Sequence, residues 1–127
     1  MCIRDRNYAL HMPANLALGA SAPLLCAGIT LYSPLRHWKA GPGKKVAIVG
    51  LGGLGHMGVK IAHAMGAEVT VVVRSAQTRQ SLSQLFRERI RTVGAGQDTI
   101  EELCKSADVV IAAALVVGCL LYTSRCV

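Results

Sequence analysis

The sequence has none of the segments that mark membrane-spanning or secreted proteins. Its longest apolar run, Val109 to Leu121, is shorter than the ~18–20 residues that cross a bilayer. No charged stretch followed by an apolar stretch and a cleavage site opens the chain. Five cysteines form no Cys-x-x-Cys pair and cannot all pair with one another, which argues against a disulfide framework. We therefore expect a cytoplasmic protein that does not bind a membrane.

Aromatic and acidic side chains are also scarce. One Trp, three Tyr and one Phe are scattered along the chain, too few for a platform on which single-stranded nucleic-acid bases could stack. The 14 basic residues outnumber the 7 acidic ones and give a net charge of +7, which suits an anionic partner. The sequence thus favours a phosphate-bearing small molecule over nucleic acid.

The rest of the composition is that of a globular protein. With 127 residues, of which 52% are hydrophobic and 17% charged, the chain can bury one core. Two cores would not fit, because compact domains most often run to ~100–150 residues. Residues 1–6 and 119–127 fit neither a helical nor a strand pattern and resemble translated sequencing-adapter read-through. We expect these ends to stand apart from the fold.

The interior begins with a helix pattern and then a strand pattern. Ser21 can cap a helix over Ala22 to Leu31, with a proline in its first turn. This helix is predicted to end at Ser33-Pro34, because the residue before a proline is biased out of the helical conformation. After the turn Gly41-Pro42-Gly43-Lys44, the apolar run Val46 to Val49 predicts a strand buried on both faces.

A second helix and a second strand follow the glycines that begin at Gly50. Six residues recur at helical spacing and predict one apolar stripe: Leu54, Met57, Gly58, Ile61, Ala62 and Met65. The valine-rich segment Glu68 to Val73 predicts a strand. Strand, helix and strand within this span predict parallel pairing with a right-handed crossover.

Weaker patterns continue the alternation. Leu82, Leu85, Phe86 and Ile90 suggest a third helix, and Ile90 to Val93 a short strand before the loop Gly94-Ala95-Gly96. Asp98 and Glu101 resemble a capping box for a helix to Ser106, and Asp108 to Ala114 resembles a further buried strand. The predicted fold class is α/β, a partial Rossmann fold comprising the first half of a doubly wound parallel sheet, truncated at both ends.

The strand-to-helix turn carries the glycine pattern of dinucleotide-binding proteins. Gly50, Leu51, Gly52, Gly53, Leu54 and Gly55 satisfy G-x-G-x-x-G directly after the first strand. The first glycine allows the tight turn, the second lets the backbone approach a pyrophosphate, and the third brings the helix against the strand. Free N–H groups at the helix N-terminus then favour phosphate. A turn that needs glycine for packing alone is the lesser alternative.

The end of the second strand indicates which dinucleotide binds. Enzymes that use NAD usually place an Asp or Glu there to hold the ribose 2′-OH, whereas this sequence has Arg74-Ser75. A guanidinium can bind a 2′-phosphate through two hydrogen bonds, and a serine hydroxyl can add another. We therefore predict NADP as cofactor, held by Arg74, Ser75 and Arg79. A solvated arginine at a strand end is the alternative.

The stretch Ala22 to Ala67, APLLCAGITLYSPLRHWKAGPGKKVAIVGLGGLGHMGVKIAHAMGA, resembles the zinc-dependent medium-chain alcohol dehydrogenases. It is most similar to their cinnamyl-alcohol-dehydrogenase-like, NADP-dependent aldehyde reductases. The resemblance implies hydride transfer between NADP(H) and a small-molecule alcohol or aldehyde, with a catalytic zinc that polarises the substrate oxygen. It also implies that Cys26 is one of three protein ligands of that zinc and that Thr30 lies near the nicotinamide. Ala113 falls where relatives often have a threonine lining the cofactor site.

The resemblance also sets the expected domain plan. Residues 1–20 would be a suspect terminus and the end of a missing catalytic domain, residues 21–40 a linking helix, and residues 41–118 a partial dinucleotide-binding domain before the suspect terminus 119–127. The other zinc ligands would lie in the missing domain. We expect the fragment itself to be inactive and poorly soluble, and a full-length protein to form a homodimer.

Two alternatives remain open from the residues. Thr99 to Ala114 resembles the ending of several dinucleotide-binding enzymes, including methylenetetrahydrofolate dehydrogenases, which predicts another NADP-dependent Rossmann enzyme without a metal. The cluster Arg87, Arg89 and Arg91 would suit a non-catalytic nucleotide-binding or RNA-binding module. The first alternative does not explain Cys26 in its motif, and arginine clusters such as the second one are most often solvated helix faces.

Overall fold

The structure, a computed structural model, describes residues 11–86, 89–114, 119–120 and 125–126. Its helices are α2 (Leu18–Ser21), the 3-10 helix η1 (Ala22–Leu25), α3 (Ala27–His37), α4 (Gly53–Ala64), α5 (Ala76–Phe86) and α6 (Gln97–Ser106). Its strands are β1 (Lys45–Val49), β2 (Glu68–Val73), β3 (Arg91–Gly94), β4 (Val109–Ala112), β5 (Cys119–Leu120) and β6 (Arg125–Cys126).

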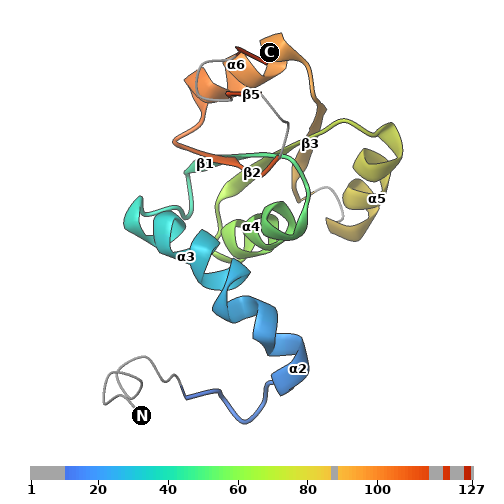
Figure 1. The fold of residues 1–127 in the computed structure, drawn as a ribbon. Helices are drawn as coiled ribbons and strands as arrows, with labels where there is room; N and C mark the ends of the chain where they lie inside the picture. Colours follow the sequence, from blue (N-terminus) through green and yellow to red (C-terminus); the bar gives the residue numbers. More distant parts are fainter. Residues whose placement is uncertain (1–10, 87–88, 115–118, 121–124, 127) are drawn as a thin grey trace.

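Four parallel strands form the central sheet, in the order β3-β2-β1-β4. Figure 1 shows α4 and α5 on one side of this sheet and α6 on the other. Crossovers that change sides after the third strand are those of a doubly wound sheet, so the predicted α/β fold, a partial Rossmann fold, is confirmed. The short strands β5 and β6 pair antiparallel in a separate sheet, in a segment for which the sequence predicted no element.

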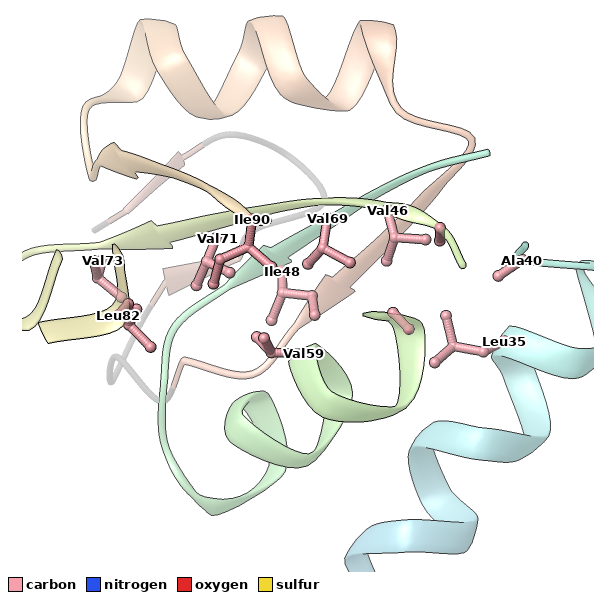
Figure 2. Packing of buried hydrophobic residues seen from close by; sticks show 12 residues of the cluster. Leu35, Ala40, Val46, Ile48, Val59, Val69, Val71, Val73, Leu82 and Ile90 are labelled. Carbon is pink, nitrogen blue, oxygen red and sulfur yellow. The ribbon is translucent and has the colours of Figure 1, made fainter. Parts of the chain in front are cut away.

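The core lies between the sheet and α4. Side chains that alternate along β1 and β2 point toward α4, as Figure 2 shows, where they meet Leu35 of α3 and Val59 of α4. The strand members of this cluster are Val46, Ile48, Val69, Val71 and Val73. Leu82 of α5 and Ile90, just before β3, complete one end of the cluster. Because β1 and β2 carry this core, the turn between β1 and α4 rests on the best-packed part of the fold.

Helix α3 packs directly on α4, and a glycine makes the close contact. A Cβ atom added at Gly58 would lie 3.3 Å from Cδ1 of Leu31 and 3.3 Å from Cδ1 of Ile48. The small residue therefore lets α3 approach α4 and the strand beneath it. This contact joins the middle of α3 to the middle of α4.

The predicted end and cap of the first helix are wrong. Helix α3 continues through Pro34 to His37, although this proline cannot donate a hydrogen bond to the preceding turn. Leu31 and Leu35, on either side of it, are 4% and 0% exposed, and this burial offsets the lost hydrogen bond. Ser21 lies inside α2, where its hydroxyl donates to the Ala17 carbonyl instead of capping the next helix.

The predicted second helix and second strand are confirmed as α4 and β2, but the apolar stripe of α4 is rotated. Its buried residues are Gly55, Gly58, Val59 and Ala62, whereas Leu54 is 44% exposed. The rotation follows from Gly55, which must face the carbonyl of Gly50 and turns that side of the helix inward.

Later predictions were right about the elements and wrong about details. The N-cap of α6 is Gly96, and Asp98 lies in the first turn, so no side chain caps this helix as a capping box would require. Strand β3 begins one residue later than predicted and takes in Gly94. Strand β4 is shorter than predicted and is not fully buried, because it is an edge of the four-stranded sheet, and Val110 is 40% exposed.

Among the helices that the structure describes, none is by itself long and apolar enough to cross a membrane. Two helical segments taken together, Leu18–Leu25 and Ala27–His37, have the required length and composition but are bent by 51° at the break between them.

Candidate functional site: a glycine-rich turn at the carboxyl edge of the sheet

The turn from β1 into α4 needs glycine at its first and last positions. Gly50 has φ +94°, a conformation that other residues rarely adopt, and a Cβ there would lie 2.7 Å from Cβ of Ala114. A Cβ at Gly55 would overlap the carbonyl oxygen of Gly50. These two glycines bring the helix, the strand and the segment after β4 into contact.

The two middle glycines face open space instead. A Cβ atom at Gly52 would have no neighbour closer than 4.0 Å, and at Gly53 nothing would lie within 4 Å. Gly52 is the N-cap of α4 and has no side chain to bond to the amides of the first helical turn. An open, glycine-lined backbone with free amides at a helix N-terminus is the arrangement that accepts phosphate oxygens. The structure therefore fits a diphosphate at this turn.

The segment after β4 forms one wall of the turn. The Ala113 N–H donates to the Val49 carbonyl at 2.8 Å, and the Ala113 carbonyl is the nearest atom to a Cβ built on Gly52. The Ala113 side chain packs toward Gly55, with its Cβ 3.4 Å from an added Cβ at that glycine. Ala113, which the sequence placed at the cofactor site, thus borders the glycine turn, and its neighbour Ala114 is a wall residue that sequence reasoning missed.

The end of β2 lies beside this turn. The Gly50 N–H donates to the Val72 carbonyl at 3.0 Å, which ties the turn to the last residues of β2. Arg74 and Ser75 follow directly and are both exposed. The Ser75 Oγ accepts a hydrogen bond from the Thr78 N–H at 3.3 Å, at the start of α5. Its own O–H stays available as a donor, since a hydroxyl can donate and accept at once.

Arg79 lies against the end of β3. Its Nη1 would be 3.4 Å from a Cβ atom added at Gly94, and its Nε is buried without a hydrogen-bond partner among the described residues. The three residues predicted to hold a 2′-phosphate thus lie at the carboxyl ends of β2 and β3. Strand β2 is the neighbour of β1, which leads into the glycine turn.

Cys26 and Thr30 lie at the N-terminal end of α3, the helix that packs on α4. Cys26 immediately precedes α3, and its thiol is free and exposed. The Thr30 Oγ1 donates to the Cys26 carbonyl at 2.7 Å, so the two residues are neighbours along one side of the helix, as their spacing predicted. The hydroxyl oxygen of Thr30 remains available as an acceptor.

The described part of the chain does not by itself hold a metal ion. It contains no group of three or more His, Cys, Asp or Glu side chains arranged to bind one. A catalytic zinc needs three protein ligands and an open position, and a single thiolate does not meet that requirement. Cys26 can therefore supply one ligand at most.

A separate cavity of about 690 Å³ lies beneath α6, at the opposite edge of the sheet. Lys45, Glu68 and Arg91 line it at the amino ends of their strands, together with Ser106 at the end of α6. Ligands of open α/β sheets bind at the carboxyl ends of the strands. The cavity is therefore not the cofactor site, which lies at the glycine turn.

Comparison with known proteins agrees with this geometry. Residues 39–120 match the family model of the alanine dehydrogenase/PNT C-terminal domain, a Rossmann-type family to which this part of the chain belongs. NADP-dependent alcohol dehydrogenase C 1 of Mycolicibacterium smegmatis is 51% identical over 107 residues, which are 84% of this chain and 30% of that protein. The chain belongs to the medium-chain alcohol dehydrogenase family. The resemblance seen in residues 22–67 is confirmed.

Further relatives support the same family. Aldehyde reductase YahK of Escherichia coli is 62% identical over 73 residues, 58% of this chain and 21% of that protein. The CAD from Helicobacter pylori, solved as a complex with NADP(H), superposes with a TM-score of 0.71 at 40% identity and covers 87% of this chain and 30% of that one. This medium-chain dehydrogenase chain thus spans about a third of its relatives' length and matches their nucleotide-binding part.

Proposed function

We propose that this chain is the NADP(H)-binding part of an alcohol dehydrogenase or aldehyde reductase. The observation that carries the proposal is the glycine turn, in which Gly50 and Gly55 are required for packing while Gly52 and Gly53 leave the backbone open. The names of the relatives support the cofactor, since one is an NADP-dependent alcohol dehydrogenase and another was solved with NADP(H).

The diphosphate would lie against Gly52 and Gly53, where backbone N–H groups of the first turn of α4 donate to its oxygens. The open space at these two glycines lets the oxygens come close to the backbone. Ala113 would border the diphosphate on one side, since its side chain packs against Gly55.

The 2′-phosphate of NADP would be held beyond the end of β2. Arg74 and Arg79 supply the positive charge, and the Ser75 hydroxyl supplies a further donor. No carboxylate stands at the end of β2, where an acidic residue would repel a 2′-phosphate. These features support NADP over NAD.

The whole reaction would be hydride transfer between NADP(H) and a small alcohol or aldehyde. NADPH supplies the hydride when bound, and this chain's own residues position it. Thr30 would border the nicotinamide, and Cys26 would contribute one thiolate to a zinc whose remaining ligands come from a full-length protein. A cytoplasmic setting and a homodimer complete the proposal, the former supported by the free thiols of Cys26 and Cys104.

The other two hypotheses have less support. An NADP-dependent alcohol dehydrogenase matches 84% of this chain and an aldehyde reductase matches 58% of it. These matches support the alcohol dehydrogenase hypothesis over a methylenetetrahydrofolate-dehydrogenase-like enzyme or an RNA-binding module. In the arginine cluster Arg89 and Arg91 are exposed, and Arg87 lies outside the described residues.

Isothermal titration calorimetry of the purified chain tests the proposal. We expect NADPH to bind more tightly than NADH, and adenosine 2′,5′-bisphosphate to bind more tightly than AMP, because each pair differs by the 2′-phosphate. A random oligonucleotide serves as the control polyanion. Binding of the oligonucleotide alone, with a steep dependence on salt, would overturn the proposal in favour of a nucleic-acid-binding module.

A further inference from the structure

The guanidinium of Arg79 lies beside Gly94, at the end of β3. Arg79 belongs to the first turn of α5, where its N–H donates to the Ser75 carbonyl at 3.2 Å. Its side chain runs from there to the end of β3, and the guanidinium occupies the space beside Gly94, with Nη1 3.4 Å and Cζ 3.9 Å from a Cβ atom added there. A side chain at position 94 would therefore touch the guanidinium.

The register of the sheet places this contact next to the cofactor turn. Gly94 pairs with Val73, the last residue of β2, while Gly50 bonds to Val72 on the other side of the same strand. In dinucleotide-binding folds, the residue after the second strand holds the adenosine ribose. Arg79 thus lies on the side of that ribose position away from the glycine turn.

The charge of Arg79 is not neutralised by the described residues. Within the described ranges the structure records one ion pair, between Lys44 and Asp108. It lies at the amino ends of β1 and β4, whereas Arg79 lies at the carboxyl end of β3. The buried Nε of Arg79 has no hydrogen-bond partner within those ranges. A guanidinium whose charge is not paired favours an anionic ligand such as a phosphate.

We propose that Gly94 is a specificity-determining residue, because the absence of a side chain at the end of β3 leaves Arg79 free to bind the 2′-phosphate of NADP. The inference rests on the proposed function and adds to it the position that sets the choice between NADP and NAD. A carboxylate at position 94 would pair with the Arg79 guanidinium and repel the 2′-phosphate. NAD, which lacks that phosphate, would be unaffected.

The deciding variant is Gly94→Asp. The backbone of Gly94 is not in the left-handed region, and the added Cβ would make ordinary contacts, so an aspartate can be accommodated. We expect the dissociation constant for NADPH to rise roughly 10- to 100-fold, the range for losing a hydrogen bond to a charged group, while that for NADH changes less than about threefold. Titration calorimetry with both coenzymes measures the two constants.

Two matched variants show whether the effect of Gly94→Asp comes from the charge of the new side chain, from its size or from its position. Gly94→Asn has nearly the same shape without the charge, so it should weaken NADPH binding much less than Gly94→Asp. Gly96→Asp adds the same charge two residues away, at the N-cap of α6, where a Cβ would face Thr99 and not Arg79. An aspartate is favourable at an N-cap, so this variant should keep the preference for NADPH.

Arg79→Gln provides an independent test if Gly94→Asp does not fold. It should lose the preference for NADPH by a similar factor, and adding Gly94→Asp to it should produce little further loss, since the two substitutions remove the same interaction. The inference is overturned if the parent chain prefers NADPH and either Gly94→Asp or Arg79→Gln keeps that preference. If the parent chain binds neither coenzyme, the proposed function fails, and the inference fails with it.

Discussion

The two faces of the central sheet are covered to different extents. On the face under α4, Val46, Ile48 and Val71 are at most 1% exposed and pack into one cluster with α3, α4 and α5 (Figure 2). On the face under α6, Ala47 and Val72 are equally buried. The residues of the edge strand β4 are not fully buried. Val110 is 40% exposed, and α6 buries none of its own residues fully.

This difference shows where the fold needs rigidity. The glycine turn connects β1 to α4, so the backbone amides that would hold a diphosphate are anchored on the fully packed face. A turn whose geometry depends on contacts within a few tenths of an ångström, as at Gly50 and Gly55, requires such an anchor. Helix α6, on the other face, contributes none of its residues to the candidate site.

The substitution expected to do most harm is Gly55→Ala. Its Cβ would overlap the Gly50 carbonyl oxygen, and neither backbone segment can move without disturbing the packed face. We expect a loss of unfolding free energy on the order of 4 kcal/mol or more, together with loss of NADPH binding. Chemical denaturation measures the first effect and calorimetry the second.

Gly53→Ala is the matched control for that substitution. It lies in the same turn, and nothing within 4 Å meets its Cβ. It should leave stability unchanged or raise it by up to about 1 kcal/mol, because alanine is the better helix former. Equal destabilisation by the two variants would contradict the packing argument for Gly55.

A pair of core substitutions measures the difference between the two faces. Ile48→Ala on the α4 face should cost about 3 kcal/mol, since the side chain is fully buried in the cluster. Leu103→Ala on α6, where the side chain is half-buried, should cost about 1 kcal/mol. Urea unfolding of both variants under one set of conditions gives the comparison. Costs of equal size would show that both faces contribute alike.

The smallest effect is expected at Asp108, which joins the starts of β1 and β4. Its carboxylate accepts hydrogen bonds from the Lys44 Nζ at 2.8 Å and from the Lys45 N–H at 2.9 Å. The hydrogen bond from Lys44, and then that from Lys45, lower the pKa of Asp108 below its ordinary value of 3.8. The carboxylate is exposed, so its contribution to stability is small.

The direction of the pH effect follows from the lowered pKa. The contribution of Asp108 is present above the ordinary pKa of a free carboxyl and is lost as the pH falls through the lower pKa of the folded state. Asp108→Asn should lower the melting temperature by a few °C at most at neutral pH. Melting curves followed by circular dichroism should converge with those of the parent chain as the pH falls through the lowered pKa of Asp108. A difference that persists or grows in acid would contradict this assignment.

The first half of the fold could be predicted because each local signal agreed with the others. The valines of β1 and β2, the glycines between them and the helix pattern of residues 54–65 all specify one strand–helix–strand unit. The glycine motif and the basic residues after β2 identified the candidate cofactor site for the same reason, since the motif lies within that unit and the basic residues follow it closely in the sequence.

Other features depended on contacts that no local pattern contains. Helix α3 runs through Pro34 because Leu31 and Leu35 are buried against α4, a packing energy that the local rule for proline does not include. Gly94 was assigned to a loop, and its contact with Arg79 depends on the pairing of β3 with β2. Predicting these contacts would require knowing how α3 packs on α4 and how β3 pairs with β2, and each pair is separated in the sequence by another element.

The amino-acid sequence alone determined the family, the α/β alternation and the turn at which phosphate can bind, because glycine spacing and apolar periodicity act over a few neighbouring residues. The tertiary structure decided which side of α4 is buried and that β4 is an exposed edge. It also decided that the Arg79 guanidinium lies beside Gly94 at the end of β3. These outcomes arise from pairing between strands and packing between helices, and those bring together residues that are distant along the chain.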